Sequence, residues 1–190
     1  GMNDRVTEGL DVAESEDYAM VCLAEGDYAE SELVMRDGIG LRGGYDSSFV
    51  FDGNQNRASI TVADPAGVYF GPDVTAASLE YLTVAADTSA TDAEHRAAVT
   101  VEDSPALIAG CDLVGDNPSG AAAASSYGVR VLGDGGAQVI IAGNPDIVGA
   151  STTTPDFTYG VYVGGGAEVF LTGSRAGLIG PRQSVRGGPA

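Results

Sequence analysis

The chain has 190 residues, with nine arginines, no lysine and 27 aspartates and glutamates, and its formal net charge is −18. Proteins that bind nucleic acid contact the phosphates through clustered cations, so this charge argues strongly against a nucleic-acid partner. The apolar fraction of 44% is enough for a hydrophobic core, and no stretch approaches the roughly 18 consecutive apolar residues of a membrane span.

The first predicted element is a short helix near the amino end. Val6, Leu10 and Ala13 follow one another at helical spacing and have acidic residues on both sides. Such a helix has one apolar face, which must be buried against another element. We expect residues 1–18 to form a cap that covers the open end of the following domain.

From residue 33 onward the sequence repeats a pattern in which two apolar residues flank one variable residue. The segment at residues 60–71 aligns without a gap with residues 99–110. The apolar pairs are Leu33/Met35, Ile60/Val62, Val99/Val101, Val129/Val131 and Val161/Val163. Alternation with a period of two is typical of strands that bury one face. These segments are therefore predicted to be the first strands of successive repeats.

Each repeat continues with a short turn, a second strand that ends near a glycine, and a third short strand. The third strands are predicted at residues 49–51, 82–84, 113–114, 147–148 and 178–179. Three strands and three turns per repeat describe a parallel β-helix, in which each strand lies about 4.8 Å above its counterpart one coil earlier. We predict an all-β fold, a single-stranded parallel β-helix of about six coils over residues 19–180, followed by a tail at residues 181–190.

The opening of this repeat carries a recognisable pattern. Val21-Cys-Leu-Ala-Glu-Gly-Asp-Tyr-Ala-Glu-Ser31 is followed by Leu33-Val-Met-Arg-Asp-Gly-Ile-Gly-Leu-Arg-Gly-Gly-Tyr-Asp46. These residues resemble the first coils of right-handed parallel β-helix proteins of the pectin-lyase-like superfamily, most of all its secreted or envelope-associated bacterial members. The resemblance implies a right-handed helix and an extracellular or cell-envelope location, with an export signal upstream of residue 1.

The resemblance implies little about activity, because this superfamily includes lyases, hydrolases, esterases, adhesins and structural domains. The chain has no Gly-His-Gly, Asn-Thr-Asp or Arg-Ile-Lys sequence, the signatures of polygalacturonase-like members, and it has no lysine for a lyase-type site. No catalytic residue of those enzymes can be placed on this chain.

Four aspartates are predicted to stack at one corner, directly after the first strands. They are Asp37, Asp64, Asp103 and Asp134. Stacked carboxylates repel one another unless they accept turn N–H groups or share cations. The sequence leaves two interpretations open, a row of turn-forming aspartates and a calcium site, since calcium prefers oxygen ligands. No other cofactor is expected.

Three long connections, at residues 87–97, 116–127 and 150–159, follow third strands and are predicted to share one edge of the solenoid. Insertions on one edge of a solenoid often form its binding face. The candidate ligand-binding residues on this edge are Asp92, Glu94, His95, Tyr127, Phe157 and Tyr159. Aromatic rings with nearby hydrogen-bonding groups suit saccharides, whereas the alternative is that these aromatics only anchor the stems of the loops.

The sequence thus favours a non-catalytic, secreted or cell-envelope module that binds glycan or protein through its loop edge. The alternative is a polysaccharide-active enzyme, a lyase or hydrolase, or a fragment of one, using acids such as Asp92, Asp112 or Asp116. A lone histidine without an identifiable nucleophile weighs against catalysis. A pure spacer is the third alternative.

A final prediction concerns the outward positions of the second strands. Val68, Leu107, Ile140 and Phe170 form an apolar row if the strand register is as aligned. Such a row marks a contact surface, for example between two copies of the chain, whereas a register slip by one residue would exchange the two faces.

Overall fold

The computed structural model describes residues 5–54, 57–87, 95–115, 125–133, 137–143, 147–149 and 157–172. Over these ranges the chain forms one helix and 16 strands, and the strands make three parallel sheets of six, five and five strands. Each coil contributes one strand to each sheet in turn. The fold is therefore a parallel β-helix, as predicted from the repeat.

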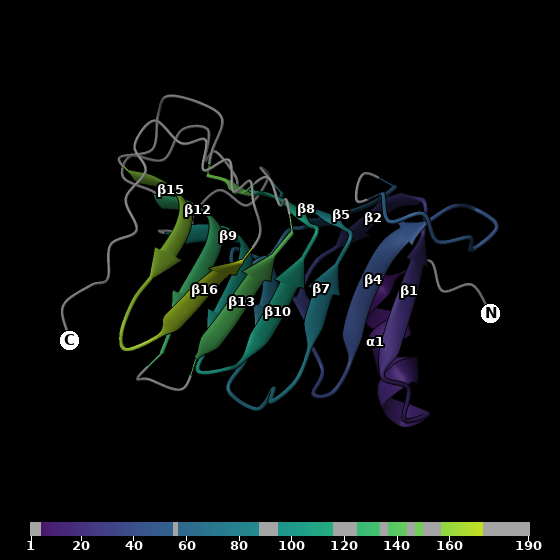
Figure 1. The fold of residues 1–190 in the computed structure, drawn as a ribbon. Helices are drawn as coiled ribbons and strands as arrows, with labels where there is room; N and C mark the ends of the chain where they lie inside the picture. The colour runs from purple at the N-terminus through teal and green to yellow at the C-terminus, as the bar shows by residue number, and fades with distance from the viewer. Residues whose placement is uncertain are drawn as a thin grey trace.

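The first sheet, which we call sheet A, holds the first strand of every coil. Its strands, in spatial order, are β1 (Met20–Ala24), β4 (Gly40–Tyr45), β7 (Ser78–Glu80), β10 (Ala106–Ala109), β13 (Gln138–Ala142) and β16 (Glu168–Thr172). In Figure 1 this sheet faces the viewer, and no other labelled element lies in front of it.

Sheets B and C close the other two sides of the solenoid. Sheet B consists of β2 (Gly26–Glu30), β5 (Ala58–Val62), β8 (Thr83–Ala86), β11 (Asp112–Val114) and β14 (Ile147–Val148). Sheet C consists of β3 (Leu33–Val34), β6 (Val68–Phe70), β9 (His95–Glu102), β12 (Ser125–Leu132) and β15 (Phe157–Val163).

The sense of winding is visible in Figure 1. The strands of sheet A run upward at the front, β12 and β15 of sheet C run downward behind them, and the chain advances from right to left. A helix that turns and advances in this way is right-handed, which is also the usual hand of connections between parallel strands.

The core consists of ladders of like residues that repeat from coil to coil. In sheet A, Leu41 pairs with Leu79, and the ladder continues through Ile108 and Ile141. Sheet C stacks Val68, Val99, Val129 and Val161 in the same way. These side chains are at most 5% exposed, so all three sheets enclose one continuous apolar interior.

The amino-terminal helix α1 (Val6–Ser15) covers the first coil, as predicted. Val6, Leu10 and Ala13 are buried against that coil. The helix start has no side-chain cap from Arg5. Instead, the buried Glu30 of β2 accepts hydrogen bonds from Val6 N at 2.6 Å and Thr7 Oγ1 at 2.8 Å.

Among the described residues, no helix has the length and apolar character required to cross a bilayer.

The predicted repeat is out of phase in one coil. Ile60 lies in sheet B and pairs with Tyr28 and Val84, whereas Val99 lies in sheet C and pairs with Val68. The alignment of residues 60–71 with 99–110 is therefore wrong by one sheet. The reason is that the inward ladders of all three sheets use the same alternation of apolar and variable residues, so the pattern alone does not identify the sheet.

Two further predictions fail because of this phase error. Val68 faces the core and is fully buried, so it is not part of an outward row. Residues 49–51 form no third strand, because Phe51 makes only an isolated antiparallel bridge with Tyr45. The strand predicted at residues 178–179 lies outside the described residues.

Candidate functional site

The outer face of sheet C carries two rows of side chains that are three positions apart along each strand. One row pairs Ala97, Tyr127 and Tyr159, and the other pairs Thr100, Arg130 and Tyr162. The core residues Ala98 and Val99 lie between these rows on β9. Two consecutive inward positions explain why residues three apart share the outer face, where strict alternation would separate them.

On β12, one of the two consecutive inward positions is a glycine, Gly128, because the core leaves no space for a side chain there. A side-chain carbon on Gly128 would lie 2.5 Å from Cγ2 of the core residue Ile147 and 2.8 Å from the carbonyl oxygen of Gly160. The sequence Tyr-Gly-Val occurs twice, at residues 127–129 and 159–161, and the two copies pair in register on β12 and β15.

The three tyrosines of these rows form one aromatic cluster. The rings of Tyr127 and Tyr159 are stacked, with their centroids 5.6 Å apart and an interplanar angle of 8°. The Tyr162 ring lies 5.3 Å from the Tyr127 ring and 5.8 Å from the Tyr159 ring, tilted by 56° and 59°. Offset and tilted contacts at these distances are favourable for aromatic pairs. We refer to Tyr127, Tyr159 and Tyr162 as the tyrosine cluster.

Polar groups surround the tyrosine cluster. The Nδ1 atom of His95 lies 3.4 Å from the hydroxyl of Tyr127, and the Arg130 guanidinium lies 5.8 Å from the centroid of the Tyr127 ring. Within the described residues, the buried Oγ1 of Thr100 and Nε of Arg130 have no hydrogen-bond partner. These two side chains are neighbours in register, and both of these atoms are shielded from solvent.

Burial differs among the three tyrosines. Tyr127 is only 4% exposed, whereas Tyr159 and Tyr162 are half-buried. Burial raises the pKa of the Tyr127 hydroxyl above its ordinary value of 10.0. The group therefore stays neutral at physiological pH, where it can donate and accept hydrogen bonds. Tyr127 is the buried member of the cluster, and Tyr159 and Tyr162 are its accessible members.

Three of the predicted ligand-binding residues come together at this site, namely His95, Tyr127 and Tyr159. Phe157 pairs through its backbone with Ser125 at the start of β15, and its side chain is outside the described part of the structure. Asp92 and Glu94 also lie outside the described residues. Sequence reasoning missed Arg130 and Tyr162, because they occupy the variable position between the apolar residues of a repeat. The repeat of Tyr-Gly-Val directly before both residues is the one signal that could have drawn attention to them.

The four stacked aspartates are not brought to one corner. Asp37 and Asp103 follow sheet C strands, whereas Asp64 follows β5 of sheet B, so the predicted stack is wrong at Asp64 for the same reason as the repeat phase. Asp134 lies outside the described residues. In the part of the chain that the structure describes, no three His, Cys, Asp or Glu side chains are grouped to hold a metal ion.

Two of these aspartates accept hydrogen bonds from backbone N–H groups. Oδ1 of Asp37 accepts hydrogen bonds from Thr75 N at 2.6 Å, Thr75 Oγ1 at 2.9 Å and Ala76 N at 3.1 Å, which ties the corner of one coil to the next. Oδ1 of Asp64 accepts a hydrogen bond from Ala66 N at 2.8 Å. The Asp64 contact is that of a turn-forming aspartate, whereas Asp37 links two successive coils.

Replacing Asp37 with asparagine is expected to lower the melting temperature near neutral pH. Hydrogen bonds from Thr75 and Ala76 hold the pKa of the Asp37 carboxyl below its ordinary value of 3.8. A lowered folded-state pKa gives stabilisation that is complete above the ordinary value and is lost as the pH falls through the folded-state value. The difference in melting temperature between the two proteins should therefore shrink in acid. Thermal unfolding as a function of pH measures it, and a difference that grows on acidification would contradict this role.

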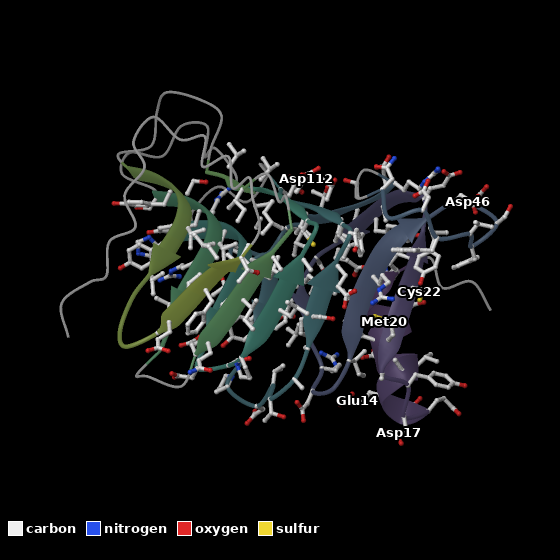
Figure 2. The ribbon with its side chains drawn as sticks, in the orientation of Figure 1. Glu14, Asp17, Met20, Cys22, Asp46 and Asp112 are labelled. Atoms are coloured by element: carbon white, nitrogen blue, oxygen red, sulfur yellow. The ribbon has the colours of Figure 1, made fainter. Side chains whose placement is uncertain are left out.

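A second aromatic cluster lies at the opposite end of the solenoid, around Phe51 on the connection between β4 and β5. The ring of Phe51 lies 5.1 Å from that of Tyr45 and 5.2 Å from that of Tyr81. Phe49 has a left-handed backbone (φ 58°) and is 51% exposed. Oδ1 of Asp46 holds this turn by accepting hydrogen bonds from Ser48 N and Val50 N. Figure 2 labels Asp46 on this protruding loop, which sequence reasoning took for a strand.

Comparison of the chain with protein-family models, with curated proteins and with solved structures gives no match. The parallel β-helix is thus established by the structure alone, and the tyrosine cluster is characterised by its own geometry.

Proposed function

We propose that this chain is a binding module and that its ligand is a saccharide held on the outer face of sheet C by the tyrosine cluster. The observation that carries the proposal is the grouping of Tyr127, Tyr159 and Tyr162 with His95 and Arg130 on one outward face. Sugar rings offer flat C–H faces that pack on aromatic rings, and their hydroxyls need polar partners close by.

The polar surroundings of the cluster support this ligand class. The partly exposed Arg130 side chain places its guanidinium 5.8 Å from the centroid of the Tyr127 ring, and a guanidinium supplies several N–H donors. A purely structural aromatic stack would need only apolar neighbours. The combination of aromatic rings and a guanidinium on one face is what a ligand rich in hydroxyl groups requires.

The proposal is for binding without turnover. Of the three acids that an enzyme could use, Asp112 lies on β11 of sheet B, whereas the tyrosine cluster lies on sheet C. Asp92 and Asp116 lie outside the described residues.

The finer assignment to secreted or envelope-associated proteins of the pectin-lyase-like superfamily also belongs to this proposal, and it is supported by the pattern of residues 21–46 together with the right-handed β-helix.

Loss of the two accessible rings is expected to weaken saccharide binding by about fivefold per ring, because each stacked ring contributes on the order of 1 kcal/mol. The protein is screened against a panel of neutral and acidic oligosaccharides, and the tightest binder is titrated into wild type, Tyr159→Ala, Tyr162→Ala and the double variant. Because the chain has no tryptophan, tyrosine fluorescence or calorimetry serves as the readout.

Tyr18→Ala is the matched control, because Tyr18 is 59% exposed and is not a member of the tyrosine cluster. Binding that is weakened in the cluster variants and unchanged in Tyr18→Ala supports the proposal. Binding that survives the double variant, or an absence of binding to every saccharide in the panel, would overturn it. Release of shortened or unsaturated products would show that the site is catalytic.

A further inference from the structure

The outer face of sheet A carries an apolar row on three adjacent strands. Leu107 of β10 pairs with Ile140 of β13, which pairs with Phe170 of β16. The three side chains are 36%, 43% and 49% exposed. Three of the four residues predicted for an outward row are thus outward, and they follow one another without interruption.

A second outward row runs beside the first, two residues further along each strand. It consists of the small residues Ala109, Ala142 and Thr172, which are also paired in register. The six side chains together form a ridge of large residues next to a strip of small ones. None of the six is ionisable, although the chain carries a net charge of −18.

We propose that this face of sheet A binds the same face of a second copy of the chain, forming a two-fold symmetric dimer. The two-fold axis would run along the solenoid, in the interface, between the two rows. The ridge of each copy then lies over the small strip of the other, so that Ile140 faces Ala142 of the partner subunit. An isologous contact requires a surface that is complementary to itself, and a ridge beside a parallel strip has this property.

Charge favours a second copy over a partner of another kind. A basic protein would be attracted to the 27 acidic residues of the chain, and these six positions contain none of them. Two copies of so acidic a chain repel each other except where their facing surfaces are uncharged. In addition, parallel sheets usually have both faces covered, and no described element covers this one (Figure 1).

A shallow hollow of about 440 Å³ extends the same face toward the amino end. Its lining includes Ala76, Ala77, Pro105, Leu107 and Ile140, again without an ionisable side chain. It widens the uncharged surface beyond the two rows. The two copies are strongly acidic and repel each other outside this face, so the dimer should be weak and depend on concentration. Salt should strengthen the dimer, because it screens the repulsion between the acidic copies.

Sedimentation equilibrium of the full chain tests the proposal over loading concentrations from about 1 µM to about 1 mM. Wild type should show a monomer–dimer equilibrium that shifts toward dimer as salt is raised. Ile140→Asp places a carboxylate at the centre of the face, and it should raise the dissociation constant at least about tenfold. Val114→Asp is the control, because Val114 is 37% exposed on sheet B. A monomer at every concentration, or a dimer unaffected by Ile140→Asp, would overturn the proposal.

Cross-linking tests the geometry of the dimer in a Cys22→Ser background, since Cys22 is the exposed thiol of this chain. Facing sheets pack about 10 Å apart, so a bifunctional maleimide of similar span is used. A mixture of Ile140→Cys and Ala142→Cys proteins should cross-link more than either variant alone. Equal cross-linking in all three samples would contradict the ridge-over-strip arrangement. This inference is independent of saccharide binding, which takes place on sheet C.

Discussion

Replacing Glu30 with alanine should lower the free energy of unfolding by about 3 kcal/mol, because the substitution removes two hydrogen bonds to a buried carboxylate. Glu30 is 5% exposed and accepts from Val6 N and Thr7 Oγ1 at the start of α1. It supplies both the missing cap and a negative charge at the positive end of the helix dipole. Without it, α1 should detach from the first coil and expose its apolar face.

Urea unfolding and hydrogen exchange of α1 measure this effect. Glu30→Gln retains an acceptor oxygen without the charge, so its loss of stability should be intermediate. Glu32→Ala is the matched control, because this exposed acid lies two residues further along and its loss should change stability by no more than about 0.5 kcal/mol. Equal effects of Glu30→Ala and Glu32→Ala would show that the carboxylate does not anchor the helix.

Gly67→Ala should be the most damaging small substitution in the solenoid, with a loss of about 4 kcal/mol or a failure to fold. Gly67 lies between β5 and β6 with φ 64°, and an added side-chain carbon would meet the carbonyl oxygens of Ala97 and Ala98 in the next coil. The same corner is tied to that coil by a hydrogen bond from Ala97 N to the carbonyl of Pro65 at 2.9 Å. The next coil leaves no space for a methyl group.

Gly38→Ala separates this clash from backbone strain. Gly38 has a similar φ of 73°, but a side-chain carbon there would have nothing within 4 Å. Its replacement should therefore cost only the strain of a left-handed alanine, about 1 kcal/mol. The difference between the two variants in urea unfolding isolates the effect of coil stacking. If both variants lost the same stability, the close packing of the coil above Gly67 would be wrong.

The kind of fold could be predicted from the sequence because inward ladders leave a strong signal. Apolar residues at alternating positions, such as Val99 with Val101 and Val129 with Val131, recur wherever a strand covers the core. The same physics made the repeat phase hard to assign, since Ile60-Thr-Val and Val99-Thr-Val serve different sheets equally well. The long connection after β4 delays the next strand, so that residues 58–62 belong to sheet B. The local alternation of apolar residues does not indicate this delay.

The candidate site could be predicted only in part. His95, Tyr127 and Tyr159 were expected on loops along one edge, whereas they lie together within strands of sheet C. Tyr162 was missed because strict alternation puts residues three apart on opposite faces. The core-facing Gly128 and Val129 bring Tyr127 and Arg130 to the same side. Glu30 was also missed, because a cap provided by a distant strand leaves no mark near the helix.

The most direct test of the proposed function is to map saccharide contacts by nuclear magnetic resonance. The tightest oligosaccharide from the screening panel is titrated into protein with labelled tyrosines, and the ring resonances of all eight tyrosines are followed. Binding on sheet C predicts that the signals of Tyr159 and Tyr162 shift most, that Tyr127 shifts less because it is buried, and that Tyr18 is unaffected. Saturable shifts confined to Tyr45, Tyr81 or Tyr18, with the tyrosine cluster unchanged, would place the ligand elsewhere and contradict the account.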